Sequence, residues 1–108
     1  MEKEEKLYLK IGDALIAKDT NITHGKMMTS PGLKYKNKVF FFFHNNAITF
    51  KLGKEFSPEK NGIERWDYLS PFKNKPPMHA WFELPYSEKD KWEAMAFLAL
   101  EKMKEQLG

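Results

Sequence analysis

The sequence has 108 residues, of which 42 % are hydrophobic, 15 % aromatic and 31 % charged, with a formal net charge of +3. This length suits one domain, and the aromatic content can fill one packed core, so composition excludes a disordered chain. There is no cysteine, which excludes disulfides and Cys-based zinc sites. No apolar run reaches the ~20 residues of a membrane helix, and the charged start Met1–Lys6 is unlike a signal peptide. We expect a single domain over residues 1–108, located in the cytoplasm and not bound to a membrane.

The first third of the chain predicts a helix, a strand and a turn. Lys3–Lys18 has apolar residues at helical spacing and acidic residues in its first turn, which favour the helix dipole. Ile22–Met28 predicts a strand. Ser30-Pro31-Gly32 then predicts a type II turn, because proline suits its second position and glycine tolerates the positive φ of the third.

The centre predicts two hairpins, with turns at Lys36-Asn37 and Asn45-Asn46. Asparagine enters the left-handed conformations that two-residue hairpin turns require. The second turn fixes a register, because strand side chains alternate between the two faces. The residues that it places on one face, as three facing pairs, are Phe43 with Ile48, Phe41 with Phe50, and Val39 with Leu52.

The last part predicts a short helix at Ser57-Pro58-Glu59, an irregular segment, a strand at His79–Leu84 and a final helix capped by Ser87. The aromatic and apolar anchors of the irregular segment are Trp66, Tyr68, Leu69 and Phe72. The final helix has a broad apolar stripe made of Trp92, Met95, Ala96, Ala99 and Met103. We therefore expect an α+β fold: an N-terminal helix, an antiparallel sheet of four or five strands with a short helical excursion, and a C-terminal helix packed on the sheet.

Three segments, taken in order, resemble the TfoX N-terminal domain family. The matching strings are Gly25–Met28 followed by Gly32–Phe40, then Ile48–Leu52, and then Pro77–Pro85 before an alanine-rich helix. The sequence departs from that family at Met28, where Phe is usual, and at Thr29, where Gly is usual. The YjbR-like proteins, of related architecture, are the nearest alternative. The resemblance implies an α+β domain and a link to regulation, since TfoX itself regulates competence genes, whereas many stand-alone members have no assigned activity.

The sequence predicts no catalytic, cofactor or metal site. It has no nucleophile elbow, phosphate-cradling glycine loop or paired carboxylates. The hydroxyls of Ser30, Ser57 and Ser87 are explained by turns and helix caps. The three histidines, His24, His44 and His79, lie far apart in sequence, and a zinc site needs three close ligands. We therefore expect neither an enzyme nor a bound cofactor.

The middle of the chain combines basic and aromatic residues. From Thr20 to Lys54 there are six lysines and no acidic residue. The candidate contact residues for a nucleic acid or another partner are Lys34, Lys36, Lys38, Lys51, Tyr35, Phe40 and Phe42. Exposed rings on a sheet could stack on bases, but two helices and one sheet pack most economically when both faces of the sheet are covered. We therefore expect the N-terminal helix to cover these rings.

Two functional classes follow from these observations. The first is a non-enzymatic interaction or accessory regulatory module that acts, as a monomer or a homodimer, on an unknown protein partner. The alternative is a domain that binds nucleic acid through its lysine-rich central hairpins. With Arg65 as the single arginine, base-specific contacts lack their usual donor, so we expect such binding to be weak. Exposure of Phe40 and Phe42 distinguishes the two classes.

Overall fold

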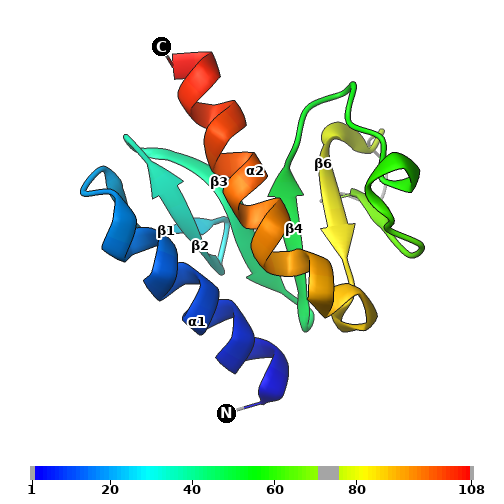
Figure 1. Cartoon of the computed structure of the whole chain (residues 1–108), viewed down its shortest axis with the longest axis horizontal. Coiled ribbons are helices and arrows are strands. Elements are labelled where there is room, and N and C mark those ends of the chain that lie inside the picture. The colour runs from blue at the N-terminus through cyan, green and yellow to red at the C-terminus, as the bar shows by residue number, and fades with distance from the viewer. Residues whose placement is uncertain (1, 71–75, 108) are drawn as a thin grey trace.

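One antiparallel sheet of six strands carries two helices on one of its faces (Figure 1). This is seen in a computed structural model that describes residues 2–70 and 76–107. The strand order across the sheet is β1-β2-β3-β4-β6-β5. The predicted α+β fold is confirmed, with six strands in place of four or five. In chain order the elements are α1 (Lys3–Lys18), β1 (Ile22–Met27), β2 (Ser30–Tyr35), β3 (Lys38–His44), β4 (Ala47–Lys51), the 3₁₀ turn η1 (Glu59–Asn61), β5 (Asp67–Leu69), β6 (Met78–Leu84), the 3₁₀ turn η2 (Tyr86–Glu88) and α2 (Lys89–Leu107).

The two central hairpins form as predicted. Asn45 and Asn46 have φ values of 51° and 59°, as a two-residue turn with the twist of the flanking strands requires. Lys36 and Asn37 also have positive φ values, of 49° and 72°. The predicted pairs of β3 and β4 are confirmed where Phe41 faces Phe50 and where Phe43 faces Ile48.

A β-bulge in β3 corrects the prediction for Val39. Leu33 of β2 pairs with Phe41, but the next residue, Lys34, pairs with Val39, so Phe40 is an extra residue in β3. An extra residue resets the alternation of side chains between the faces. Phe40 therefore joins the core at 0 % exposure, whereas Val39 is half-buried outside it.

The predicted turn at Ser30-Pro31-Gly32 is wrong, because these residues open β2. The chain reverses two residues earlier, at Met28 and Thr29, with Met28 at a φ of 56°. Gly32 is required by close packing: a Cβ there would lie 2.7 Å from the carbonyl oxygen of Phe41. Pro31 is tolerated because the pairing of β2 with β3 begins only at Gly32.

Two further expectations in the C-terminal half are corrected. Part of the segment predicted to be irregular is β5, a three-residue edge strand whose Tyr68 pairs with Phe82. Such a strand is too short to show an alternating pattern, and Phe72 lies outside the described residues. The last helix begins at Lys89 rather than after a Ser87 cap, because η2 comes first, where the N–H of Glu88 donates to the carbonyl of Pro85.

Both helices pack on the same face of the sheet, so the expectation that α1 covers the other face is wrong (Figure 1). From α1, the Tyr8 ring stacks on Phe43 at a centroid distance of 5.3 Å. From α2, the buried indole N–H of Trp92 donates to the carbonyl of Leu84 at 3.2 Å. The two helices lie side by side because each has an apolar stripe too narrow to cover a six-stranded sheet alone. Within the described ranges, neither helix is long and apolar enough to cross a membrane.

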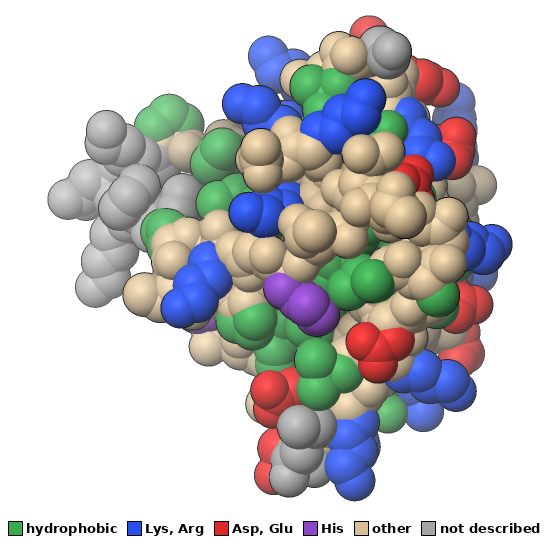
Figure 2. Space-filling view, turned by 90° about the vertical axis from the view of Figure 1, so that its left-hand side faces the viewer, with side chains coloured by type: hydrophobic (Ala, Val, Ile, Leu, Met, Phe, Trp, Pro, Cys, Tyr) green, Lys and Arg blue, Asp and Glu red, His purple; other side chains and the backbone are tan. Residues whose placement is uncertain are grey.

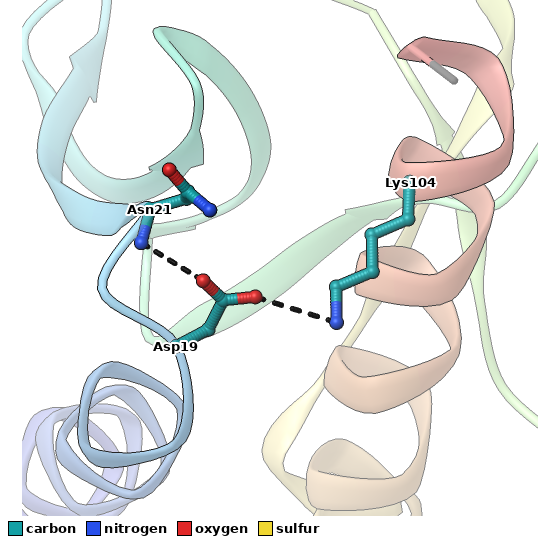
Figure 3. A network of polar contacts seen from close by, with 3 residues as sticks. All are labelled: Asp19, Asn21 and Lys104. Carbon is teal, nitrogen blue, oxygen red and sulfur yellow. Dashed lines mark hydrogen bonds and ion pairs between the residues drawn. The ribbon is translucent and has the colours of Figure 1, made fainter.

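A polar contact joins the C-terminal ends of the two helices (Figure 3). Asp19, directly after α1, accepts a hydrogen bond from the N–H of Asn21 at 2.9 Å and pairs with the Lys104 ammonium of α2 at 3.4 Å. The backbone hydrogen bond first, and then Lys104, hold the pKa of the Asp19 carboxyl below its usual value. The contact is at the surface, so the helices are positioned mainly by their apolar faces.

We call the side that bears α1 and α2 the helix face and the opposite side the outer face. The core lies between the helices and the helix face. The outer face is defined by Ser30, Gly32, Phe42, Thr49, Trp81 and Glu83, which alternate with core residues along their strands.

Candidate functional site

The aromatic residues proposed from sequence do not form one surface. Phe40 and Tyr35 belong to the core on the helix face, whereas Phe42 lies on the outer face. Phe40 and Phe42 are 0 % and 2 % exposed. The structure thus gives them no shared exposed platform on which bases could stack.

The proposed lysines are divided between the outer face and one end of the molecule. The stem of Lys34 passes over Gly25 on the outer face. Lys36 and Lys38 are exposed at the β2–β3 turn, where the ammonium of Lys104 also lies over the Tyr35 ring, at 5.9 Å. Lys51 lies over the Trp81 ring at 6.0 Å and lines a hollow with two further lysines, Lys54 and Lys102.

Figure 2 shows the side of the molecule on the left of Figure 1. Basic side chains are spread over it in several places, with acidic side chains among them. The basic side chains on this side of the molecule therefore form no continuous patch.

A cleft of about 550 Å³ lies on the outer face. It is bounded by the β1–β2 turn, the end of β3 and the β5–β6 pair. This volume suits a small organic molecule. Its apolar lining residues are Met28, Phe42, Leu69 and Pro77, and its polar ones are Ser30, His44, Asn45, Asp67, Ser70 and Glu83, with Tyr68 beside them.

Ser30 and His44 form a hydrogen-bonded pair in this cleft. The Ser30 hydroxyl lies 2.9 Å from Nδ1 of His44. The hydroxyl donates to the ring when Nδ1 is unprotonated and accepts from it when Nδ1 carries a proton. Ser30 is buried and His44 exposed, so the pair presents the imidazole at the cleft surface. The reversal at Met28 and Thr29 creates this contact, because it places Ser30 at the start of β2.

Asp67 and Glu83 face each other across β5 and β6 on the opposite side of the cleft. Burial first, and then repulsion by Asp67, raise the pKa of the Glu83 carboxyl, while His44 acts in the opposite direction. Among the described residues, no lysine or arginine forms an ion pair with either carboxylate. The cleft therefore has a negative side that no described lysine or arginine neutralises.

Thr49 lies under this part of the cleft. It pairs with Phe42 on one side and with Glu83 on the other, and it is 1 % exposed. Its hydroxyl has no hydrogen-bond partner among the described residues. Burying a hydroxyl without a hydrogen-bond partner costs free energy, so Thr49 reduces the stability of the fold at this position. Trp81 and Phe42, with ring centroids 5.6 Å apart, complete the surface around it.

The three histidines lie on three strands, β1, β3 and β6. Within residues 2–70 and 76–107, no three His, Asp or Glu side chains are grouped so that they could hold a metal ion. The cleft thus combines apolar walls with dispersed polar groups, an arrangement that suits an organic molecule better than a bare ion.

Sequence reasoning missed this cleft for an identifiable reason. The sequence predicts a turn at Ser30, and the separation of Ser30 from His44 along the chain hides their contact. One usable signal was Glu83, an acidic residue within the otherwise apolar run Ala80–Leu84 of an inner strand. A carboxylate there needs either a partner or access to solvent.

No protein-family model, curated protein or solved structure matches the chain. The likeness to the TfoX N-terminal family therefore rests on the sequence motifs alone.

Proposed function

We propose that this chain is a non-enzymatic binding module of the TfoX N-terminal type that acts as an accessory regulator through the cleft on its outer face. One observation carries the proposal: a face free of α1 and α2 is hollowed into a cleft where apolar walls meet Ser30, His44, Asp67 and Glu83. Binding sites have this character, with a few convergent polar groups in an apolar surround.

We assign the cleft to binding rather than to catalysis. The Ser30 hydroxyl and the His44 ring resemble a nucleophile and its base, but activation also needs a third group that orients the ring. Among the described residues, no carboxylate is hydrogen-bonded to His44. The pair is better explained as a rigid polar wall, because its hydrogen bond fixes the imidazole at the surface.

Amide NMR with a set of anionic, neutral and cationic fragments tests this proposal. We expect shifts to concentrate at the amides of Ser30, His44, Asp67 and Glu83. His44→Ala should weaken the binding, whereas His24→Ala should not, because both histidines are exposed on strands but only His44 lines the cleft. Shifts that are absent, or that concentrate at the Lys36-Asn37 turn, would contradict the proposal.

One observation favours the alternative of nucleic-acid binding. Lys104 of α2, which also pairs with Asp19, lies with Lys36 at the Tyr35 ring, so the hairpin lysines have a basic neighbour from the C-terminal helix. Such a cluster attracts polyanions by counterion release, which loses ~10³–10⁵ in affinity between about 50 and 200 mM salt for six to ten phosphate contacts.

We expect single-stranded DNA to bind only at low salt, as measured by fluorescence anisotropy. Lys36→Glu and Lys38→Glu should weaken this binding more than Lys10→Glu on α1 does, since Lys10 lies outside the cluster. Tight binding at physiological salt with a preferred base sequence would make the alternative the better proposal.

A further inference from the structure

We propose that the ligand of the outer-face cleft is a small organic cation: a protonated amine carried on an apolar stem. This inference rests on the proposed binding function of the cleft and names the chemistry that the cleft selects. The observation behind it is that the cleft has one negative side, with Asp67 and Glu83, while its other walls are mainly apolar.

The negative side is formed by Asp67 and Glu83, which are cross-strand partners. Facing carboxylates repel each other, and the partial burial of Glu83 strengthens this repulsion because water screens it less. The raised pKa of the Glu83 carboxyl is the expected consequence. A cation bound between them would relieve the repulsion, and a charge-assisted hydrogen bond to a carboxylate is stronger than one between neutral groups.

The rest of the cleft determines what kind of cation fits. Phe42, Leu69 and the exposed Met28 offer apolar contact that a hydrated metal ion cannot use. No described trio of His, Asp and Glu is grouped to replace the water shell of such an ion. An amine on an apolar stem uses both parts, because its head reaches the carboxylates while its stem covers the walls.

One polar group of the lining would give the cation its orientation. The exposed His44 ring, held by Ser30, lines the same cleft. When neutral, it tolerates a nearby cation, and when protonated it repels one. Acid should release the ligand, because protonation of Glu83 removes a charge that holds the amine.

The experiment compares three probes that share one stem: phenethylamine, 2-phenylethanol and 3-phenylpropionate. Amide NMR titrations at neutral pH report the shifts at Ser30, His44 and Glu83. We expect the amine to bind at least about tenfold more tightly than the alcohol, which corresponds to one charge-assisted hydrogen bond, and the carboxylate to bind least. MgCl₂ is titrated separately and should leave these amides unshifted.

Matched variants test the named residues. Glu83→Gln and the exposed Asp67→Asn should each weaken amine binding while leaving the shifts caused by the alcohol in place, which also shows that the variants are folded. Glu93→Gln on α2 removes the same charge away from the cleft and should have no effect. An equal loss in Glu93→Gln would mean that only the overall charge attracts the amine, and the inference would be overturned.

The outcomes separate the two proposals. If the alcohol or the carboxylate binds in the cleft as tightly as the amine, the inference fails and the binding function stands. If Mg²⁺ binds there and the amine does not, the cation is inorganic and the inference fails. If no probe of any charge shifts the cleft amides, both proposals fail.

Discussion

The two faces of the sheet bury their side chains by different means. On the helix face, rings such as Phe41 are covered by helices, as Tyr8 shows with its edge contact to Phe41 at 5.9 Å. On the outer face, Phe42 and Trp81 are 2 % and 5 % exposed without belonging to that core. Their rings contact each other on the outer face instead. The first face is a continuous apolar core, and the second mixes rings with Ser30, Thr49 and Glu83.

The two faces also differ in the surroundings of their buried hydroxyl groups. Each face buries one hydroxyl without a described partner, that of Tyr8 under α1 and that of Thr49 under the cleft. Burial raises the pKa of the Tyr8 phenol, as expected for an acid surrounded by apolar groups. Thr49 lies beside Glu83, a carboxylate that lines the cleft. The outer face thus bears the proposed binding site, whereas the helix face bears the continuous apolar core.

The largest expected loss of stability concerns the β-bulge, which places Phe40 in the core and its neighbour Val39 outside it. Phe40→Ala should lower the free energy of unfolding by ~3–5 kcal/mol, because it leaves a cavity in the core. Val39→Ala, one residue away, should cost less than about 1 kcal/mol, because Val39 is half-buried outside the core. Chemical denaturation measures both. Equal costs would show that β3 has no bulge.

Two glycines give the next test, one from each face. Gly32→Ala should cost ~1–3 kcal/mol, because its Cβ would lie 2.8 Å from the Cβ of Phe42 and would press on backbone as well. Gly12→Ala in α1 meets only the tip of the flexible Leu33 side chain, at 3.2 Å, and should cost less, since alanine also favours the helix. Thermal melts compare the pair. A larger loss in Gly12→Ala would contradict the packing described for the outer face.

The helix face could be predicted from the sequence, and the outer face only in part. The turn at Asn45-Asn46 is set by local backbone preferences, and it fixed which residues of β3 and β4 face the core. The bulge at Phe40 was not predictable, because four consecutive phenylalanines give no alternating signal. The cleft was missed because Ser30, His44 and Glu83 come from three strands, and their proximity exists only once the sheet has formed.

Removing either of the two buried hydroxyls should have a smaller effect, and it should stabilise the fold rather than destabilise it. Thr49→Val and Tyr8→Phe each remove a hydroxyl that lacks a described partner and keep most of the shape, so each should stabilise the fold by about 1 kcal/mol. The exposed Thr23→Val is the control and should change little. A loss of stability in Thr49→Val would mean that the Thr49 hydroxyl has a hydrogen-bond partner in the folded chain. Chemical denaturation without added ligand is the measurement.

The smallest effect is the pH dependence that Glu83 gives to stability. Because its pKa is raised in the folded chain, the folded state binds the Glu83 proton more tightly than the unfolded state does. Its favourable contribution is thus complete below the unfolded pKa of about 4.3 and is lost as pH rises through the higher folded pKa. Ionised Glu83 therefore destabilises the fold at neutral pH.

Glu83→Gln should remove this penalty, so the variant should gain stability over the natural chain at neutral pH and lose that advantage in acid. The gain should be modest, because the carboxyl is only half-buried and water screens its repulsion by Asp67. Melting temperatures of both chains, measured from about pH 3 to pH 7, test the sign across the interval where a carboxyl titrates. The same substitution should weaken amine binding. Ionised Glu83 would then lower the stability of the fold while providing the negative charge that binds the amine. If Glu83→Gln is instead less stable than the natural chain at neutral pH, ionised Glu83 does not destabilise the fold, and this explanation is wrong.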